Sequence, residues 1–249
     1  MRERYYRLER VTFKSKGQKL LGAIWYPEYA DRPPAVLILH GFPGIEKNYD
    51  LAYSLCQRNL ASMIFHYRGC WGSGGRYSFL GCFEDAMTAM EELTSRKDIL
   101  GDNVAVVGHS FGGMVAIHLS AQIKIKATVA MSPLANIKEN MPTQKRKMIV
   151  RGGIPFVKGL TMRRAMAEFE TIEKTHDPIK YVDKLSPSPL LLIHGSDDEI
   201  VPLKCSIDLH KKALEPKNLL IVKGTDHIFA GKRRYIINRV AHWIRSKVS

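Results

Sequence analysis

The motif Gly-His-Ser-Phe-Gly at residues 108–112 constrains the fold of this chain most, because it lies between a strand-like and a helix-like segment. Residues 103–107 form an apolar run, and residues 113–119 continue as a helix pattern. A GxSxG motif in that setting is typical of a nucleophile elbow, a tight turn that raises a serine hydroxyl above a sheet edge. The small glycines let strand and helix approach, and the helix start directs N–H groups at an oxyanion. The motif predicts a nucleophilic Ser110; the alternative is a plain helix N-cap.

Strand and helix patterns alternate along the rest of the chain. Solidly apolar strands separated by amphipathic helices indicate a mostly parallel sheet with helices on both faces. The predicted strands cover residues 8–13, 19–26, 35–39, 61–67, 103–107, 126–131, 190–193 and 219–222. The predicted helices cover residues 48–60, 83–96, 111–121, 203–213 and 232–247. We therefore expect an α/β protein with eight strands.

The length and charge of the chain limit its class. A chain of 249 residues with 45% hydrophobic residues suffices for a single α/β domain over residues 1–249. No apolar stretch is long enough to span a bilayer and no signal peptide is evident, so we expect a cytoplasmic protein. The formal net charge of +14 comes from scattered residues, with short basic clusters at 145–147 and 232–234. We therefore expect neither nucleic acid nor membrane as a partner, and the oligomeric state is left open.

The cysteines and glycines give no sign of a cofactor. Cys56, Cys70, Cys82 and Cys205 show no metal-binding spacing, so we expect buried free thiols and no metal. The alternative is a bridge between Cys70 and Cys82, which flank a glycine-rich loop at residues 69–75. That loop lacks the GxGxxG spacing and its acidic partner, so we expect no bound nucleotide.

One connection is far longer than a strand crossover requires. More than fifty residues separate the strand ending near Met131 from the strand beginning near Leu190. Apolar residues in this segment recur on one helical face, and Lys and Arg are frequent. We interpret residues 135–185 as a helical lid, because the connection leaves the carboxyl edge of the sheet, where ligands bind. The alternative is a packed helical pair with no gating role. The lid candidates for a substrate pocket are Phe156, Met162, Met166 and Phe169.

A serine hydroxyl needs a base that accepts its proton. After a nucleophile elbow the triad order is Ser, acid, His, so the base should follow the last strand. His227 lies in a short loop there, whereas His210 and His242 fall within helices. His109 should point away from the serine beside it, and His194 precedes the acid. We therefore predict His227 as the base.

The acid that orients the base should lie on the loop after strand 190–193. Three acidic residues stand there, and we favour Asp198 over Asp197 and Glu199. Asp226 adjoins His227, but neighbours seldom aim side chains at each other, so we interpret it as stabilising its loop.

Two backbone N–H groups should stabilise the oxyanion. Phe111 follows the nucleophile directly and supplies the first. The glycine-rich turn at residues 40–44 supplies the second, for which Phe42 is the candidate.

Five motifs, in order and over nearly the whole chain, resemble those of the α/β-hydrolase superfamily: HGFPG, FHYRGCWGSGG, GHSFGG, LLIHGSDDEIVP and GTDHIF. Within it, the chain is similar to lidded serine esterases related to feruloyl (cinnamoyl) esterases and to the catalytic domain of prolyl oligopeptidase and acylaminoacyl-peptidase enzymes. The resemblance implies a triad of Ser110, Asp198 and His227, an oxyanion hole from Phe42 and Phe111, a cap over the acyl pocket and no cofactor.

The expected function is hydrolysis of a carboxylic ester through an acyl-enzyme, with feruloyl, cinnamoyl or other aromatic esters among the candidates. The substrate could be a small molecule or an ester attached to a polymer. The first alternative is a serine peptidase of the acylaminoacyl or dipeptidyl type. The second, of another class, is a ligand-binding scaffold without catalysis.

Overall fold

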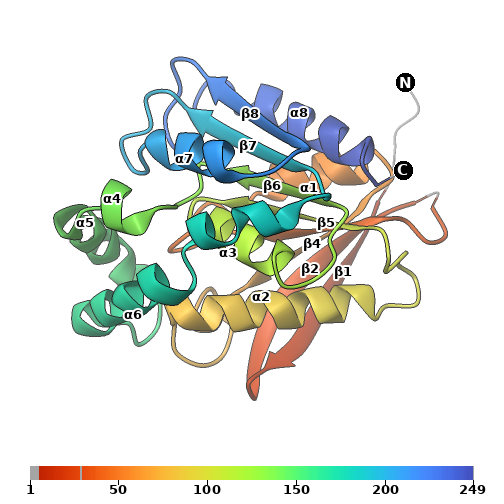
Figure 1. Ribbon diagram of the computed structural model, residues 1–249. Coiled ribbons are helices and arrows are strands. Elements are labelled where there is room, and N and C mark those ends of the chain that lie inside the picture. The colour runs from red at the N-terminus through yellow and green to blue at the C-terminus, as the bar shows by residue number, and fades with distance from the viewer. Residues whose placement is uncertain (1–5, 29, 249) are drawn as a thin grey trace.

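A computed structural model describes residues 6–28 and 30–248. Its centre is an eight-stranded sheet in the order β1-β2-β4-β3-β5-β6-β7-β8 (Figure 1). The pairs β1·β2 and β2·β4 are antiparallel, and every pair from β4 to β8 is parallel. The strands are β1 (Tyr6–Ser15), β2 (Gln18–Pro27), β3 (Ala35–Leu39), β4 (Ala61–His66), β5 (Val104–His109), β6 (Ala127–Met131), β7 (Leu190–Gly195) and β8 (Lys217–Val222). The predicted eight-stranded, mostly parallel sheet is confirmed.

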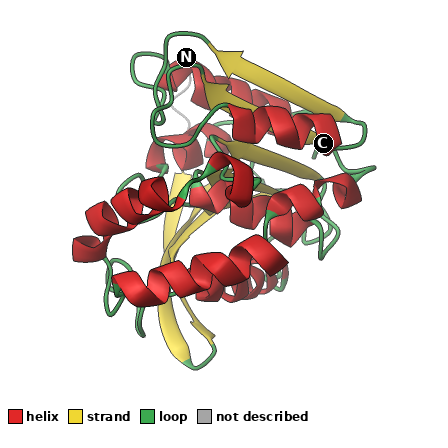
Figure 2. Ribbon diagram, turned by 60° about the vertical axis from the view of Figure 1, so that its left-hand side comes forward, coloured by secondary structure: helices red, strands yellow, loops and turns green. Residues whose placement is uncertain are grey.

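Helices cover both faces of the sheet (Figure 2). The α-helices are α1 (Tyr49–Cys56), α2 (Phe79–Thr94), α3 (Phe111–Ser120), α4 (Ile137–Asn140), α5 (Thr143–Gly153), α6 (Met162–Thr175), α7 (Lys204–Lys212) and α8 (Arg233–Arg245). One apolar cluster joins the sheet to α2, α3 and α7, and a second joins its other face to α1 and α8. All residues of β3, β5, β6 and β7 are buried, as expected for strands covered on both faces.

The long connection between β6 and β7 carries α4, α5 and α6 and lies at one end of the molecule (Figure 1). Short 3-10 turns at Ile154–Phe156, Pro178–Lys180 and Val182–Leu185 complete it. On α6 the predicted apolar face is buried at Ala165, Phe169 and Ile172. We refer to residues 132–189 as the insertion.

Glu168 on α6 fastens the insertion to α2. Its buried carboxylate accepts the backbone N–H of Phe79 at 2.6 Å and the hydroxyl of Ser78 at 3.0 Å. The Ser78 hydroxyl also accepts the N–H of Gly81 as an N-cap. Helix α2 therefore begins at Phe79, four residues before the predicted start at residue 83, because a distant carboxylate satisfies its first N–H groups.

All four cysteines are free and buried, so Cys70 and Cys82 are not bridged. The glycine-rich loop at residues 69–75 is held instead by its backbone. Cys70 forms a β-bridge with Val157, and Gly69 accepts the N–H of Lys158 at 2.8 Å. The loop after β4 and the insertion are thus joined by backbone pairing.

Candidate active site

Ser110 occupies a strained turn between β5 and α3. Its backbone has φ 57° and ψ −121°, a conformation that costs free energy in a residue with a Cβ. A Cβ on Gly108 would lie 2.0 Å from the carbonyl oxygen of Gly112, so the turn can close this tightly only with glycine there. Ser110 is the residue before α3, but its side chain makes no capping hydrogen bond. The plain N-cap alternative therefore does not explain this serine.

The loop after β3 passes directly beside the serine. A Cβ on Gly41 would lie 2.9 Å from the Cβ of Ser110, so only glycine lets this loop approach so closely. The ring of His40 donates from Nδ1 to the carbonyl of Gly41 at 2.7 Å and steadies the turn. Burial lowers the pKa of His40 to about 3, so this ring is neutral at physiological pH. The backbone of Phe42 follows in this loop, and that of Phe111 begins α3 next to Ser110.

His227 and Asp198 form a hydrogen-bonded pair. The Nδ1–H of His227 donates to Oδ2 of Asp198 at 2.7 Å. The other carboxylate oxygen of Asp198 accepts the backbone N–H groups of Ile200 at 2.9 Å and Val201 at 2.8 Å. The Asp198 side chain is completely buried. Burial opposes its ionisation, but hydrogen bonds from His194 and His227 outweigh that cost and hold the pKa of Asp198 well below its usual range.

Two of the competing acids, Asp197 and Asp226, have other partners. Oδ1 of Asp197 accepts the hydroxyl of Ser196 at 2.6 Å. Oδ1 of Asp226 accepts the N–H groups of Ile228 and Ala230, at 3.2 and 2.9 Å, so Asp226 stabilises its loop as interpreted. The acid in contact with His227 is therefore Asp198.

Two histidines surround this pair, and the sequence argument assigned neither to it. His109, expected to point away from Ser110, donates from Nε2 to the backbone carbonyl of His227 at 2.9 Å. Its ring centroid lies 4.9 Å from that of His227. His194, set aside because it precedes the acid, is buried with Nε2 3.2 Å from Oδ2 of Asp198. His194 lies in a strand and Asp198 in the loop after it, so no local sequence pattern signals this second contact.

Ser110 and His227 share a cavity of about 230 Å³. Its walls come from the loop after β3, the end of β5 and the loop after β8: Gly41, Phe42, Pro43, Gly44, Ile45, Glu46, His109, Ser110, His227 and Ile228. Among residues 6–28 and 30–248, no hydrogen bond joins Ser110 to His227 directly; the two side chains meet across this space. The three residues predicted to act together are thus brought to one site, Asp198 behind His227 and Ser110 across the cavity.

The four lid candidates for the substrate pocket are not among the walls of this cavity. Phe169 is buried against Phe79, with ring centroids 4.6 Å apart, and Phe156 is exposed. Met162 and Met166 are half-buried on α6. The helical periodicity located the apolar face of α6 correctly, but that face packs on α2 rather than on the space beside Ser110.

The insertion reaches the site at another residue. A Cβ on Gly153, the last residue of α5, would lie 2.1 Å from the ring of Phe42. The Phe42 ring is held there by Tyr77 and Phe79, with centroids 5.3 and 4.8 Å away.

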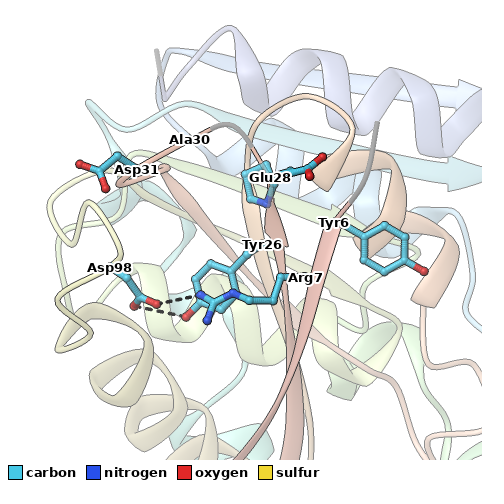
Figure 3. Close-up of a pocket in the computed structure, with 8 residues that line it drawn as sticks. Tyr6, Arg7, Tyr26, Glu28, Ala30, Asp31 and Asp98 are labelled. Atoms are coloured by element: carbon cyan, nitrogen blue, oxygen red, sulfur yellow. Dashed lines mark hydrogen bonds and ion pairs between the residues drawn. The ribbon is translucent and has the colours of Figure 1, made fainter. Parts of the chain in front are cut away.

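A second cavity, of about 620 Å³, lies where β1 begins and β2 ends (Figure 3). Two of its charged residues, Arg7 and Asp98, have partners within the protein. Asp98 accepts a hydrogen bond from Arg7 at 3.2 Å and one from Tyr26 at 3.3 Å, and the Arg7 guanidinium lies over the Tyr26 ring. None of its walls carries a nucleophile next to a base, and the chemistry belongs to the cavity of Ser110.

In the described residues, no group of three or more His, Cys, Asp or Glu side chains is arranged to hold a metal ion. None of the helices described combines the length and apolar character needed to cross a membrane.

Comparison with known sequences identifies relatives over most of the chain. Residues 48–249 match the family described as the prolyl oligopeptidase family, Peptidase_S9. The uncharacterized protein Rv2307c of Mycobacterium tuberculosis is 30% identical over 223 residues, which cover 87% of this chain and 71% of that protein. The human acylamino-acid-releasing enzyme is 27% identical over 203 residues, 75% of this chain but only 27% of the enzyme.

Solved structures agree on the fold. The α/β hydrolase GrgF from Penicillium aligns with a TM-score of 0.74 at 19% identity, covering 97% of this chain and 99% of GrgF. Est1E from Butyrivibrio proteoclasticus aligns with a TM-score of 0.76 at 19% identity, covering 96% of this chain and 98% of Est1E. Est1E has also been solved with ferulic acid bound. The predicted α/β-hydrolase fold is confirmed.

Proposed function

This chain belongs to the prolyl oligopeptidase family of α/β hydrolases, and from that premise we propose that it is a serine esterase acting through an acyl-enzyme on Ser110. The observation that carries the proposal is the hydrogen bond of 2.7 Å between Asp198 and His227, with His227 and Ser110 on the walls of one cavity. A carboxylate on Nδ1 leaves the Nε2 of His227 free to act as a base.

Acylation begins when Nε2 of His227 accepts the proton of the Ser110 hydroxyl and Oγ attacks the ester carbonyl carbon. The tetrahedral intermediate carries its negative charge on the former carbonyl oxygen. The N–H groups of Phe42 and Phe111 donate to that oxygen, since both belong to backbone next to Ser110. His227 then gives its proton to the departing alkoxide, which leaves as an alcohol.

Deacylation repeats the steps with water. His227 accepts a proton from a water molecule whose oxygen attacks the acyl carbon, and the second tetrahedral intermediate uses the same two N–H groups. When it collapses, the proton returns to Oγ of Ser110 and the carboxylic acid is released. Asp198, held ionised by its hydrogen bonds, stabilises the imidazolium in both halves.

The cavity supports an uncharged acyl or alcohol group. Pro43, Ile45 and Ile228 give it apolar walls, and its one acid is Glu46. The Glu46 carboxylate is already paired with Arg233 at 3.0 Å. An aminopeptidase needs a carboxylate to bind the substrate ammonium, so this pairing favours an esterase over a peptidase that reads a free N-terminus.

Aromatic esters remain candidates because Est1E, a structure of the same fold, has been solved with ferulic acid. In this chain the one aromatic wall other than histidine is Phe42, whose ring packs on Tyr77 and Phe79. We therefore expect short aliphatic acyl groups to be cleaved at least as fast as feruloyl groups.

The test compares acetyl and butyryl aryl esters, feruloyl esters and aminoacyl anilides as substrates of the intact protein and of Ser110→Ala. We expect ester hydrolysis in the intact protein and a fall in kcat of at least about 10⁴-fold in the variant. Faster cleavage of the anilides would replace the esterase by a peptidase. Tight retention of a ligand with no turnover would indicate a binding scaffold.

A further inference from the structure

Two imidazole rings contact the same oxygen of the Asp198 carboxylate. Its Oδ2 lies 2.7 Å from Nδ1 of His227 and 3.2 Å from Nε2 of His194. Both the Asp198 and the His194 side chains are fully buried. The second ring belongs to His194 in β7, and it is absent from the walls of the cavity around Ser110.

The surroundings of His194 fix which nitrogen carries its proton. Nε2 also lies 2.9 Å from the carbonyl oxygen of Val201, which can only accept, so Nε2 bears the hydrogen. Nδ1 lies 2.7 Å from the hydroxyl of Ser206, at the start of α7, and the two groups share a hydrogen bond. The Nε2–H of His194 thus donates to Val201 and lies 3.2 Å from Oδ2 of Asp198, while Val201 and Ser206 hold the ring at its two nitrogens.

Apart from His194, no donor to the Asp198 carboxylate among the described residues belongs to the central sheet. The N–H groups of Ile200 and Val201 hold Oδ1, but both belong to the same short loop as the carboxylate. His194 belongs to a buried strand of the sheet, so it alone among these donors ties Oδ2 to the rigid core.

We propose that His194 is a positioning residue, which holds the Asp198 carboxylate in the rotation that lets Oδ2 accept the Nδ1–H of His227. The expected effect of His194 on the rate rests on the proposed function, but the contact between His194 and Asp198 does not depend on the substrate. The N–H of His194 also draws negative charge from the oxygen that His227 uses. Without it, Oδ2 attracts the imidazolium form of His227 more strongly.

The test uses His194→Leu, which removes the donor, and His194→Gln, whose amide keeps an N–H near the position of Nε2. In His194→Leu we expect kcat to fall about 10- to 100-fold with KM unchanged, as for other residues that orient a functional group. The acid limb of kcat/KM, which reports the protonation of His227, should move to higher pH. His194→Gln should recover most of kcat and the original limb.

Thr128→Val is the matched control, because it removes the hydrogen bond of another fully buried side chain, 2.6 Å from Thr128 to Ser120, without touching the site. It should lower the Tm and leave the acid limb in place. Equal losses of kcat in His194→Leu and His194→Gln, in proportion to their Tm and with no movement of the limb, would show a merely structural histidine and overturn the proposal.

A readout without substrate separates this proposal from the function. The His227 ring is titrated by NMR in the wild type, in His194→Leu and in Ser206→Ala. Ser206→Ala removes only the hydrogen bond at Nδ1 of His194. It also keeps the test possible if the leucine variant does not fold. The His227 pKa should rise in both variants, less in Ser206→Ala. An unchanged His227 pKa in both overturns the positioning role even in an active enzyme, while a rise in a protein that cleaves no ester contradicts only the proposed function.

Discussion

At the scale of single residues, the site depends on the two carboxylate oxygens of Asp198 having different hydrogen-bond partners. The backbone N–H groups of Ile200 and Val201 occupy Oδ1 of Asp198, which leaves Oδ2 for imidazole donors. Asp197, one residue earlier, has its own partner in the hydroxyl of Ser196, and its side chain is directed toward that hydroxyl. The turn therefore decides which of two adjacent aspartates meets His227.

Substitution of these two aspartates tests that division. Asp198→Asn removes the negative charge that orients His227 and stabilises its imidazolium, so we expect kcat to fall about 10³- to 10⁴-fold. Asp197→Asn should change kcat less than about twofold, because Asp197 makes no contact with the base. Steady-state ester hydrolysis at saturating substrate measures both. A larger loss of kcat in Asp197→Asn than in Asp198→Asn would show that Asp197, and not Asp198, is the acid.

The sequence could predict Ser110, Asp198 and His227 because their positions follow from strand ends, which local patterns locate. The supporting histidines depend on side-chain direction, which those patterns do not contain. His109, the last residue of β5, meets the carbonyl of His227, a residue 118 positions later in the chain. His194 lies inside an apolar strand, where a histidine gives no sign of facing an acid four residues later.

At the scale of the elements, we expect the insertion to brace the loop after β3. Gly153 closes α5 against the ring of Phe42, whose backbone N–H we assign to the oxyanion hole. The β-bridge of Val157 with Cys70 and the cap that Glu168 provides for α2 hold the rest of the insertion in place. Sequence periodicity found the helix α6, but these anchors join residues far apart in the chain and no local pattern predicts them.

Gly153→Ala tests the brace. The added methyl group would lie 2.1 Å from Phe42, whose ring cannot retreat because Tyr77 and Phe79 pack on it. The loop after β3 must shift, and a displaced oxyanion donor should lower kcat/KM at least about tenfold.

The neighbouring Gly152→Ala is a matched control, because a Cβ there would meet nothing within 4 Å. It changes the same helix by the same methyl group, so kcat/KM should stay within about twofold of the wild type. Equal activity of the two variants in ester hydrolysis would mean that α5 does not brace the oxyanion loop.

At the scale of the whole molecule, the core holds several histidines in their neutral form. Burial lowers the pKa of His40 and His109 to about 3, and that of His66 and His118 to about 4. These four rings come from the loop after β3, from the ends of β4 and β5 and from α3, so their protonation concerns several elements of the fold. In the unfolded chain each would bind a proton near the ordinary histidine pKa of about 6.5.

Stability should therefore fall as the pH is lowered from about 6.5 to about 4. The unfolded state binds more protons than the folded state in this range, and each such group removes about 1.4 kcal/mol per pH unit from the free energy of unfolding. Asp198, whose pKa is lowered, contributes only below about pH 4. Asp177, whose pKa burial raises, offsets part of the loss at the lower end. Urea midpoints measured every half unit of pH give the slope.

His118→Gln removes one buried ring and should reduce that slope by about one proton between pH 6 and pH 4.5. His242→Gln is the matched control, because His242 is exposed on α8 and its loss should leave the slope as it is. The slope is the decisive quantity, since a general loss of stability in His118→Gln lowers every urea midpoint without changing the pH dependence. A urea midpoint independent of pH in the wild type would contradict the neutral, buried state of these histidines, because protonation would then cost the folded chain nothing.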